Sequence, residues 1–149
     1  MKNRTIPGAL GALLFLVPAA NAQSLLADIH TGPAEPRSSL PLHLTAGGVA
    51  WFRAETFATG SELFLTLGLP GSTILVKDIN PGPFDSEPEV LTLHNGLLFF
   101  RANDGVHGVE LWKSDGTAAG TVLVKDIWPG PESSAPDKLT AVGNTLFYG

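Results

Sequence analysis

A ten-residue segment returns almost unchanged 48 positions later in this sequence. Residues 74–83, ILVKDINPGP, recur as VLVKDIWPGP at residues 122–131, and LFF at 98–100 recurs as LFY at 146–148. A less similar copy at residues 26–33 aligns with 76–83 at an offset of 50. Self-similarity at a period of roughly 40 to 50 residues indicates stacked structural units that bury their apolar faces against one another.

The complete unit, residues 74–121, has the pattern of short antiparallel strands. Apolar runs lie at 89–93, 97–102, 109–114 and 121–127, and Asn-Gly or Asp-Gly pairs separate them. These pairs tolerate the positive φ angles that hairpin turns require. The sequence therefore predicts a four-stranded antiparallel meander.

Several of these runs are apolar on both alternating faces, so each sheet should be covered on both sides. Stacked identical sheets provide such cover, as blades do in a β-propeller. We predict an all-β fold of propeller-like blades, and a linear β-repeat array or sandwich is the alternative. Because propellers close with about four to eight blades, we expect an incomplete propeller that is truncated or assembles with other chains. The predicted units are a degenerate first repeat (23–73), a complete repeat (74–121) and a truncated third (122–149).

Residues 1–22 have the pattern of a secretory signal peptide. Lys2 and Arg4 precede an apolar stretch at 6–20, and Ala20-Asn21-Ala22 matches a small-residue cleavage site. The stretch is shorter than the ~20 residues that a membrane-spanning helix needs, and no later stretch is long or apolar enough. We predict cleavage after Ala22 and an exported protein, either extracellular, at the cell surface or periplasmic.

Charge and cysteine content exclude several classes of function. The formal net charge is −5 at pH 7, and an acidic protein repels phosphate backbones, so we expect no nucleic-acid partner. The chain has no cysteine. This excludes disulfides, thiolate metal sites, thiol catalysis and a lipoprotein anchor.

Residues 110–117, ELWKSDGT, followed by Gly120-Thr121, resemble the ELWxxDGT repeat family of bacterial exported proteins. The flanking segments LFFRANDG at 98–105 and VKDIWPG at 124–130 are also similar to that family. The resemblance covers residues 25–149, although the first copy departs from it and has Leu67 where the second has Asp115. It implies a surface or exported location and propeller-like repeats, and little about activity.

The repeated motif residues are expected to be structural. Asp115 should close its turn by accepting backbone amides; calcium is the alternative, but it needs about six to eight oxygen ligands. The recurring Asp78 and Asp126, which Asp28 matches, should cap backbone amides, or alternatively line a ring of carboxylates. Trp112 should be a core wedge between blades. The predicted structural set is Glu110, Leu111, Trp112, Asp115, Gly116, Thr117, Asp78 and Asp126.

Two features are candidates for binding. Trp128 replaces Asn80 in a Pro-Gly turn, so it should be exposed and able to stack on a sugar or a partner. Asn103-Asp104, His107 and Glu110 form the most polar cluster, which we interpret as a solvated hairpin loop, with metal ligation or acid–base chemistry as the alternative.

No Ser-His-Asp set, P-loop, dinucleotide-binding or zinc-protease motif occurs in the sequence. We therefore predict an exported β-repeat module with a structural, adhesion or protein- or glycan-binding role, no catalysis and no cofactor. Its partner would be a protein or glycan at the cell surface, or another copy of the chain. The alternatives are a fragment of a propeller hydrolase or lyase whose site lies in further repeats, and a non-functional gene fragment.

Overall fold

The computed structural model describes residues 43–44 and 48–149, which form ten strands in three antiparallel sheets. The first sheet contains β1 (His43–Leu44), β2 (Ala50–Thr56), β3 (Gly60–Thr66) and β4 (Ile74–Lys77). The second contains β5 (Glu89–His94), β6 (Leu97–Asn103), β7 (Val109–Ser114) and β8 (Val122–Lys125), and the third contains β9 (Thr140–Val142) and β10 (Thr145–Phe147). The all-β prediction is confirmed. The signal peptide, its cleavage site and Asp28 lie outside the described residues.

Each four-stranded sheet is a meander in which strands adjacent in sequence are hydrogen-bonded neighbours. Local turn chemistry explains this order: Asn95 and Gly96 have φ angles of 49° and 77°, as a tight two-residue hairpin between β5 and β6 requires. The strands β5 to β8 coincide with the apolar runs that the sequence indicated, except that β5 and β6 each extend one residue further. β8 is shorter than the run 121–127, because the backbone leaves the sheet at Asp126.

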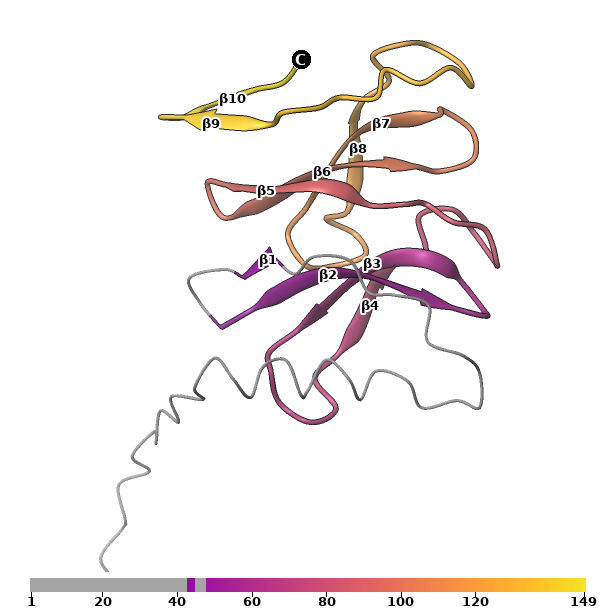
Figure 1. Ribbon diagram of the computed structural model, residues 1–149, viewed down its shortest axis with the longest axis vertical. Helices are drawn as coiled ribbons and strands as arrows, with labels where there is room; N and C mark the ends of the chain where they lie inside the picture. Colours follow the sequence, from indigo (N-terminus) through magenta and orange to yellow (C-terminus); the bar gives the residue numbers. More distant parts are fainter. Residues whose placement is uncertain (1–42, 45–47) are drawn as a thin grey trace, which may run out of the picture.

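The sheets stack face to face, and the main core lies between the first and the second (Figure 1). Trp51, Leu63, Val76 and Ile79 of the first sheet and its following loop pack in one cluster with Leu98, Phe100, Ala102 and Trp112 of the second. The β9–β10 hairpin lies against β5, on the side of the second sheet away from the first (Figure 1). Burial of these apolar side chains holds the stack together.

Residues 48 positions apart take equivalent places in the two larger sheets. Phe52 pairs with Phe64 across β2 and β3, and Phe100 pairs with Trp112 across β6 and β7. Phe52 and Phe64 also stack with ring centroids 6.0 Å apart, in a smaller cluster with Ala54. Within the described residues the sheets stack in a row and do not close into a ring.

Candidate functional site

A buried glutamate in each large sheet fixes the loop that leaves the sheet. Glu110 on β7 is completely buried; its Oε1 accepts the backbone N–H of Ser134 (3.0 Å), and its Oε2 accepts the Ser134 hydroxyl (2.6 Å) and the Ile127 N–H (3.2 Å). On β3, Glu62 is equally buried and accepts the Asn80 N–H (3.0 Å) and the Ser86 hydroxyl (2.6 Å). Buried carboxylates that hold backbone amides in this way organise loops.

The surroundings of Glu62 disfavour its charged form. Burial raises the pKa of Glu62 from 4.5 to about 7, although hydrogen bonds from Ser86, Asn80 and Ile79 lower it and the charge of Asp78 adds a smaller increase. Glu62 therefore sits between its neutral and charged forms near neutral pH. Because its carboxyl group is sealed from solvent, this shift reflects packing and does not create an accessible acid or base.

A glycine beside each glutamate lets the loop pass close to the sheet. Gly108 and Gly60 both have positive φ angles, 69° and 61°, which favour glycine. A Cβ atom at Gly108 would collide with the carbonyl group of Glu132, and one at Gly60 with that of Phe84. The glutamate and the glycine thus form one repeated device, which we call the loop latch: Gly60, Glu62 and Ser86 in the first copy, and Gly108, Glu110 and Ser134 in the second.

The Asp-Gly-Thr turn between β7 and β8 is closed by its own side chains. Asp115 Oδ1 accepts the Thr117 N–H (2.9 Å) and the Thr117 hydroxyl (2.7 Å), and Thr117 Oγ1 accepts the Gly120 N–H (2.9 Å). Beneath the turn, the hydroxyls of Ser114 and Thr121 are 2.7 Å apart and buried. The bonds from the Thr117 hydroxyl and amide lower the pKa of Asp115, so this carboxylate is charged.

In the first sheet, where Leu67 stands in place of Asp115, a serine closes the equivalent turn. Ser72 Oγ accepts the backbone N–H groups of Leu67 and Leu69 (both 3.1 Å), donates to the Leu69 carbonyl (2.7 Å) and lies 2.9 Å from Thr66 Oγ1. Two different side-chain sets therefore close the equivalent connections in the two sheets. In the first sheet a serine does so without a carboxylate.

The polar cluster predicted around His107 divides into two parts. Asp104 accepts the N–H groups of Val106 (2.9 Å) and His107 (2.8 Å), and His107 Nδ1 lies 2.7 Å from its Oδ2. Partial burial alone would raise the pKa of Asp104, but these bonds outweigh it and lower the pKa; the same contact raises the pKa of His107. Glu110 is directed into the loop latch instead, so the structure does not assemble these residues into one site.

The recurring aspartates lie at the loops that follow β4 and β8. Oδ2 of Asp78 accepts the Gly82 N–H (3.0 Å), and Oδ2 of Asp126 accepts the Gly130 N–H at a longer 3.4 Å. The Oδ1 atom of each is buried and has no hydrogen-bond partner among the described residues. Within residues 43–44 and 48–149, no group of three or more His, Asp or Glu side chains is arranged to hold a metal ion.

A charged cluster that the sequence analysis did not identify joins the first two sheets. Arg53 on β2 contacts the carboxylates of Glu87 and Glu89, and Arg101 on β6 donates to Glu89 Oε2 through Nη2 at 2.6 Å. Arg53 and Arg101 are 48 residues apart, and this spacing could have indicated that they take equivalent places in the two sheets. The cluster is partly exposed, and ion pairs of this kind contribute modestly to stability.

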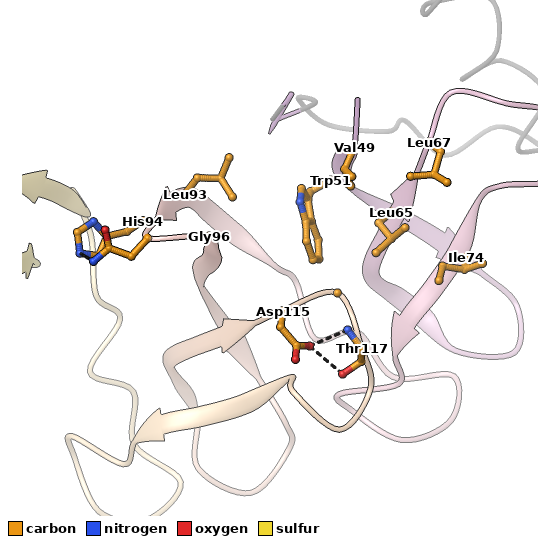
Figure 2. A pocket seen from close by; sticks show the side chains of 12 residues that line it. Val49, Trp51, Leu65, Leu67, Ile74, Leu93, His94, Gly96, Asp115 and Thr117 are labelled. Carbon is orange, nitrogen blue, oxygen red and sulfur yellow. Dashed lines mark hydrogen bonds between the residues drawn. The ribbon is translucent and has the colours of Figure 1, made fainter. Parts of the chain in front are cut away.

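An open groove of about 620 Å³ lies between the first two sheets. In Figure 2, Trp51 and Leu65 face the turn that carries Asp115 and Thr117, and Leu93 closes the other side. Gly116 forms the contact: a Cβ there would lie 3.3 Å from Leu65 and 3.4 Å from Trp51. The Asp115 carboxylate hydrogen-bonds within its own turn and is not directed at a ligand in the groove. We therefore interpret the groove as space left between the two packed sheets.

The remaining predicted residues fall into a buried set and an exposed one. Leu111 (3% exposed) and Trp112 (5% exposed) are in the interior, and Trp112 Nε1 has no hydrogen-bond partner among the described residues. Trp128, in contrast, is 60% exposed in the loop after β8. It is therefore accessible to a ligand or a partner.

In the described part of the chain, no helix is both long and apolar enough to cross a membrane. Comparisons of the sequence with protein-family models, with curated proteins and with solved structures found no match.

Proposed function

We propose that this chain is an exported, non-catalytic β-repeat module of the ELWxxDGT type that presents a binding surface to a protein or glycan. The observation that carries the proposal is the use of the motif's polar groups. Glu110, Asp115 and Thr117 all bond within the fold, to loop amides or to their own turn. Polar groups whose hydrogen bonds are made within the fold stabilise its loops and turns. Binding is then left to the side chains on the exposed surface.

Several large apolar side chains are exposed on the surface of the described residues. Trp128, Val124 and Phe84 are 60%, 41% and 63% exposed. Exposed aromatic side chains close to strands favour contact with another macromolecule. The leader sequence at residues 1–22 supports an extracellular or periplasmic setting for that contact.

The proposal is tested by export and by binding. Expressed with its leader in a bacterial host, the chain should leave the cytoplasm and begin at Gln23. The purified protein should bind to at least one member of a panel of cell-surface polysaccharides and proteins, without releasing products. Trp128→Ala should weaken binding, whereas Phe57→Ala, at the 85% exposed tip of the β2–β3 turn, should not. Retention in the cytoplasm with an intact leader, or equal losses in both variants, would contradict the proposal.

A further inference from the structure

The sequence contains three pairs in which asparagine or aspartate precedes glycine, and all three lie in turns of the second sheet. They are Asn95-Gly96 between β5 and β6, Asp104-Gly105 between β6 and β7, and Asp115-Gly116 between β7 and β8. In such a pair the backbone nitrogen of glycine can attack the side-chain carbonyl carbon and close a succinimide ring. Glycine hinders this attack least because it has no Cβ atom. The three turns offer the same reaction, and their hydrogen bonds distinguish them.

At Asp115-Gly116 both reacting groups are held. The Gly116 N–H donates to Ser114 Oγ (3.1 Å), and Asp115 Oδ1 accepts the amide and the hydroxyl of Thr117. The Thr117 hydroxyl and amide lower the pKa of Asp115, so its side chain is a carboxylate at neutral pH. A carboxylate is a poor electrophile because its negative charge repels an attacking electron pair. This turn is therefore protected by its own hydrogen bonds.

Asp104-Gly105 is held in the same way. The Gly105 N–H donates to Asn103 Oδ1 (2.8 Å), and Asp104 Oδ1 accepts the N–H groups of Val106 (2.9 Å) and His107 (2.8 Å). Partial burial acts to raise the pKa of Asp104, but the hydrogen bonds from His107 and Val106 outweigh it and lower the pKa. This side chain is also a carboxylate at neutral pH, and its turn is protected.

Asn95-Gly96 lacks these restraints. Both residues are exposed, and the Gly96 N–H has no hydrogen-bond acceptor within residues 43–44 and 48–149. A Cβ atom at Gly96 would meet nothing within 4 Å beyond its chain neighbours, so the turn has space in which to move. The Asn95 side chain is a neutral amide, whose carbonyl carbon accepts a nucleophile more readily than that of a carboxylate. Nucleophile and electrophile are therefore both available in this turn.

A histidine ring lies at the nitrogen that would leave. Asn95 Nδ2 is 3.2 Å from His94 Nε2, a distance over which a proton can be transferred. His94 is 9% exposed, and its ring centroid lies 6.2 Å from that of Phe99, which holds the imidazole in place. His94 and Gly96 lie together at the tip of the β5–β6 hairpin (Figure 2). Loss of ammonia requires a proton on Nδ2, and His94 is positioned to supply it.

We propose that Asn95 is a site of self-modification, at which the Gly96 nitrogen displaces the side-chain amide and water completes the conversion to aspartate or isoaspartate. The bond from Gly96 N to Asn95 Cγ forms as the Cγ–Nδ2 bond breaks. Gly96 loses its amide proton, and Nδ2 gains a proton through His94 and leaves as ammonia. Water then adds to one of the two ring carbonyl carbons, and the C–N bond at that carbon breaks. Nothing is oxidised or reduced, so water is the only co-reactant.

The product alters the hairpin that β9 contacts. Either product carries a negative charge beside His94 Nε2. Isoaspartate also routes the backbone through the side-chain carbon and lengthens a two-residue turn whose φ angles are 49° and 77°. The longer turn no longer matches the twist of the flanking strands. The reaction needs no ligand, so it is independent of the proposed function.

The test incubates the full chain in neutral buffer made with heavy-oxygen water, then digests it with trypsin in ordinary water for mass spectrometry. Cleavage after lysine and arginine separates the three pairs into peptides 78–101, 102–113 and 114–125. We expect peptide 78–101 to take up heavy oxygen and to split into aspartate and isoaspartate forms. Its other asparagine, Asn80, precedes a proline, whose nitrogen carries no hydrogen. The other two peptides should react about tenfold more slowly or less, since their hydrogen bonds must break first.

Two comparisons complete the test. In concentrated urea the two aspartate pairs should begin to isomerise, because the hydrogen bonds that protect them are lost. His94→Phe keeps a ring against Phe99 but removes the proton donor. This substitution should slow the labelling of peptide 78–101 by about tenfold or more.

Three results would overturn the proposal. Labelling of peptide 78–101 in urea but not in the folded chain would show that the hairpin protects Asn95. Equal labelling of all three peptides in the folded chain would show that the hydrogen bonds do not select the site. An unchanged labelling rate in His94→Phe would show that the imidazole takes no part in the reaction.

Discussion

Replacing Glu62 by glutamine should stabilise the protein at neutral pH and change little at acidic pH. Glu62 is fully buried, and its Oε2 accepts the Ser86 hydroxyl, a group that rotates and can accept a hydrogen bond as well as donate one. A hydrogen bond from the Ile79 backbone also reaches the carboxylate. A glutamine side chain has the shape of the neutral carboxyl group. Its amide oxygen can keep the Asn80 N–H, and its NH₂ can donate to Ser86.

The expected magnitude follows from the pKa of Glu62, which burial raises from 4.5 to about 7. A shift of one pKa unit corresponds to about 1.4 kcal/mol, so the full shift corresponds to roughly 3 kcal/mol. The unfolded chain loses this proton near pH 4.5, whereas the folded chain holds it until about pH 7. The stabilisation is therefore complete below pH 4.5 and is lost as the pH rises through about 7.

The assay is urea unfolding of the full chain and of Glu62→Gln, followed by tryptophan fluorescence, at pH 4.5 and at about pH 8. The difference in unfolding free energy between the two proteins should grow by roughly 3 kcal/mol in favour of the variant. Taking this difference cancels the other titrating groups, which are common to both proteins. An equal difference at both pH values would refute the argument that burial of Glu62 disfavours its charge.

Glu110→Gln is the contrasting variant. Both oxygens of Glu110 accept backbone N–H groups, Oε1 from Ser134 and Oε2 from Ile127. An amide nitrogen in place of either oxygen would face a donor, so the substitution should destabilise the protein by about 1–3 kcal/mol. A stabilising effect would contradict the argument that both oxygens of Glu110 are needed as acceptors of backbone N–H groups.

Three further predictions concern the core, a glycine and the histidine loop. Phe100→Ala, at a position that is 0% exposed in the main core, should lower the unfolding free energy by about 3–5 kcal/mol; a loss below about 1 kcal/mol would contradict the stacked-sheet packing. Gly108→Ala should lower the free energy of unfolding in urea more than Gly130→Ala does. Both glycines have positive φ angles, but only at Gly108 does a loop carbonyl occupy the space of the new Cβ. Equal losses would refute the close approach of the Glu132 carbonyl to Gly108. Asp104→Asn should return the pKa of His107 towards 6.5 in an NMR titration. An unchanged pKa would show that the contact with Asp104 does not raise the pKa of His107.

The strands and their order could be predicted because their signals are local. The Asn95-Gly96 pair determines a hairpin through its backbone preferences, and alternating or continuous apolar residues mark the strands on either side. The all-β class and the meander of the second sheet depend on such signals alone. The Asp115 turn belongs here too, since its partner Thr117 is two residues away.

The role of Glu110 could not be predicted in the same way. Its proximity in sequence to His107 suggested one polar cluster, yet the side chain bonds to Ser134, 24 residues further on. Two signals were available. Glu110 is two residues from Trp112, so strand alternation places both on the buried face. The spacing of 24 also recurs between Glu62 and Ser86.

The sequence by itself determined the β-class, the turns and the 48-residue correspondence, because each is encoded in short segments that are repeated in the chain. Tertiary structure alone decided that Val76 is buried while Val124 is exposed, and that Glu62 and Glu110 face loops rather than solvent. Equivalent residues in equivalent strands acquire different environments because burial depends on what packs against a sheet. That neighbour is set by the stacking of whole sheets, which no short segment specifies.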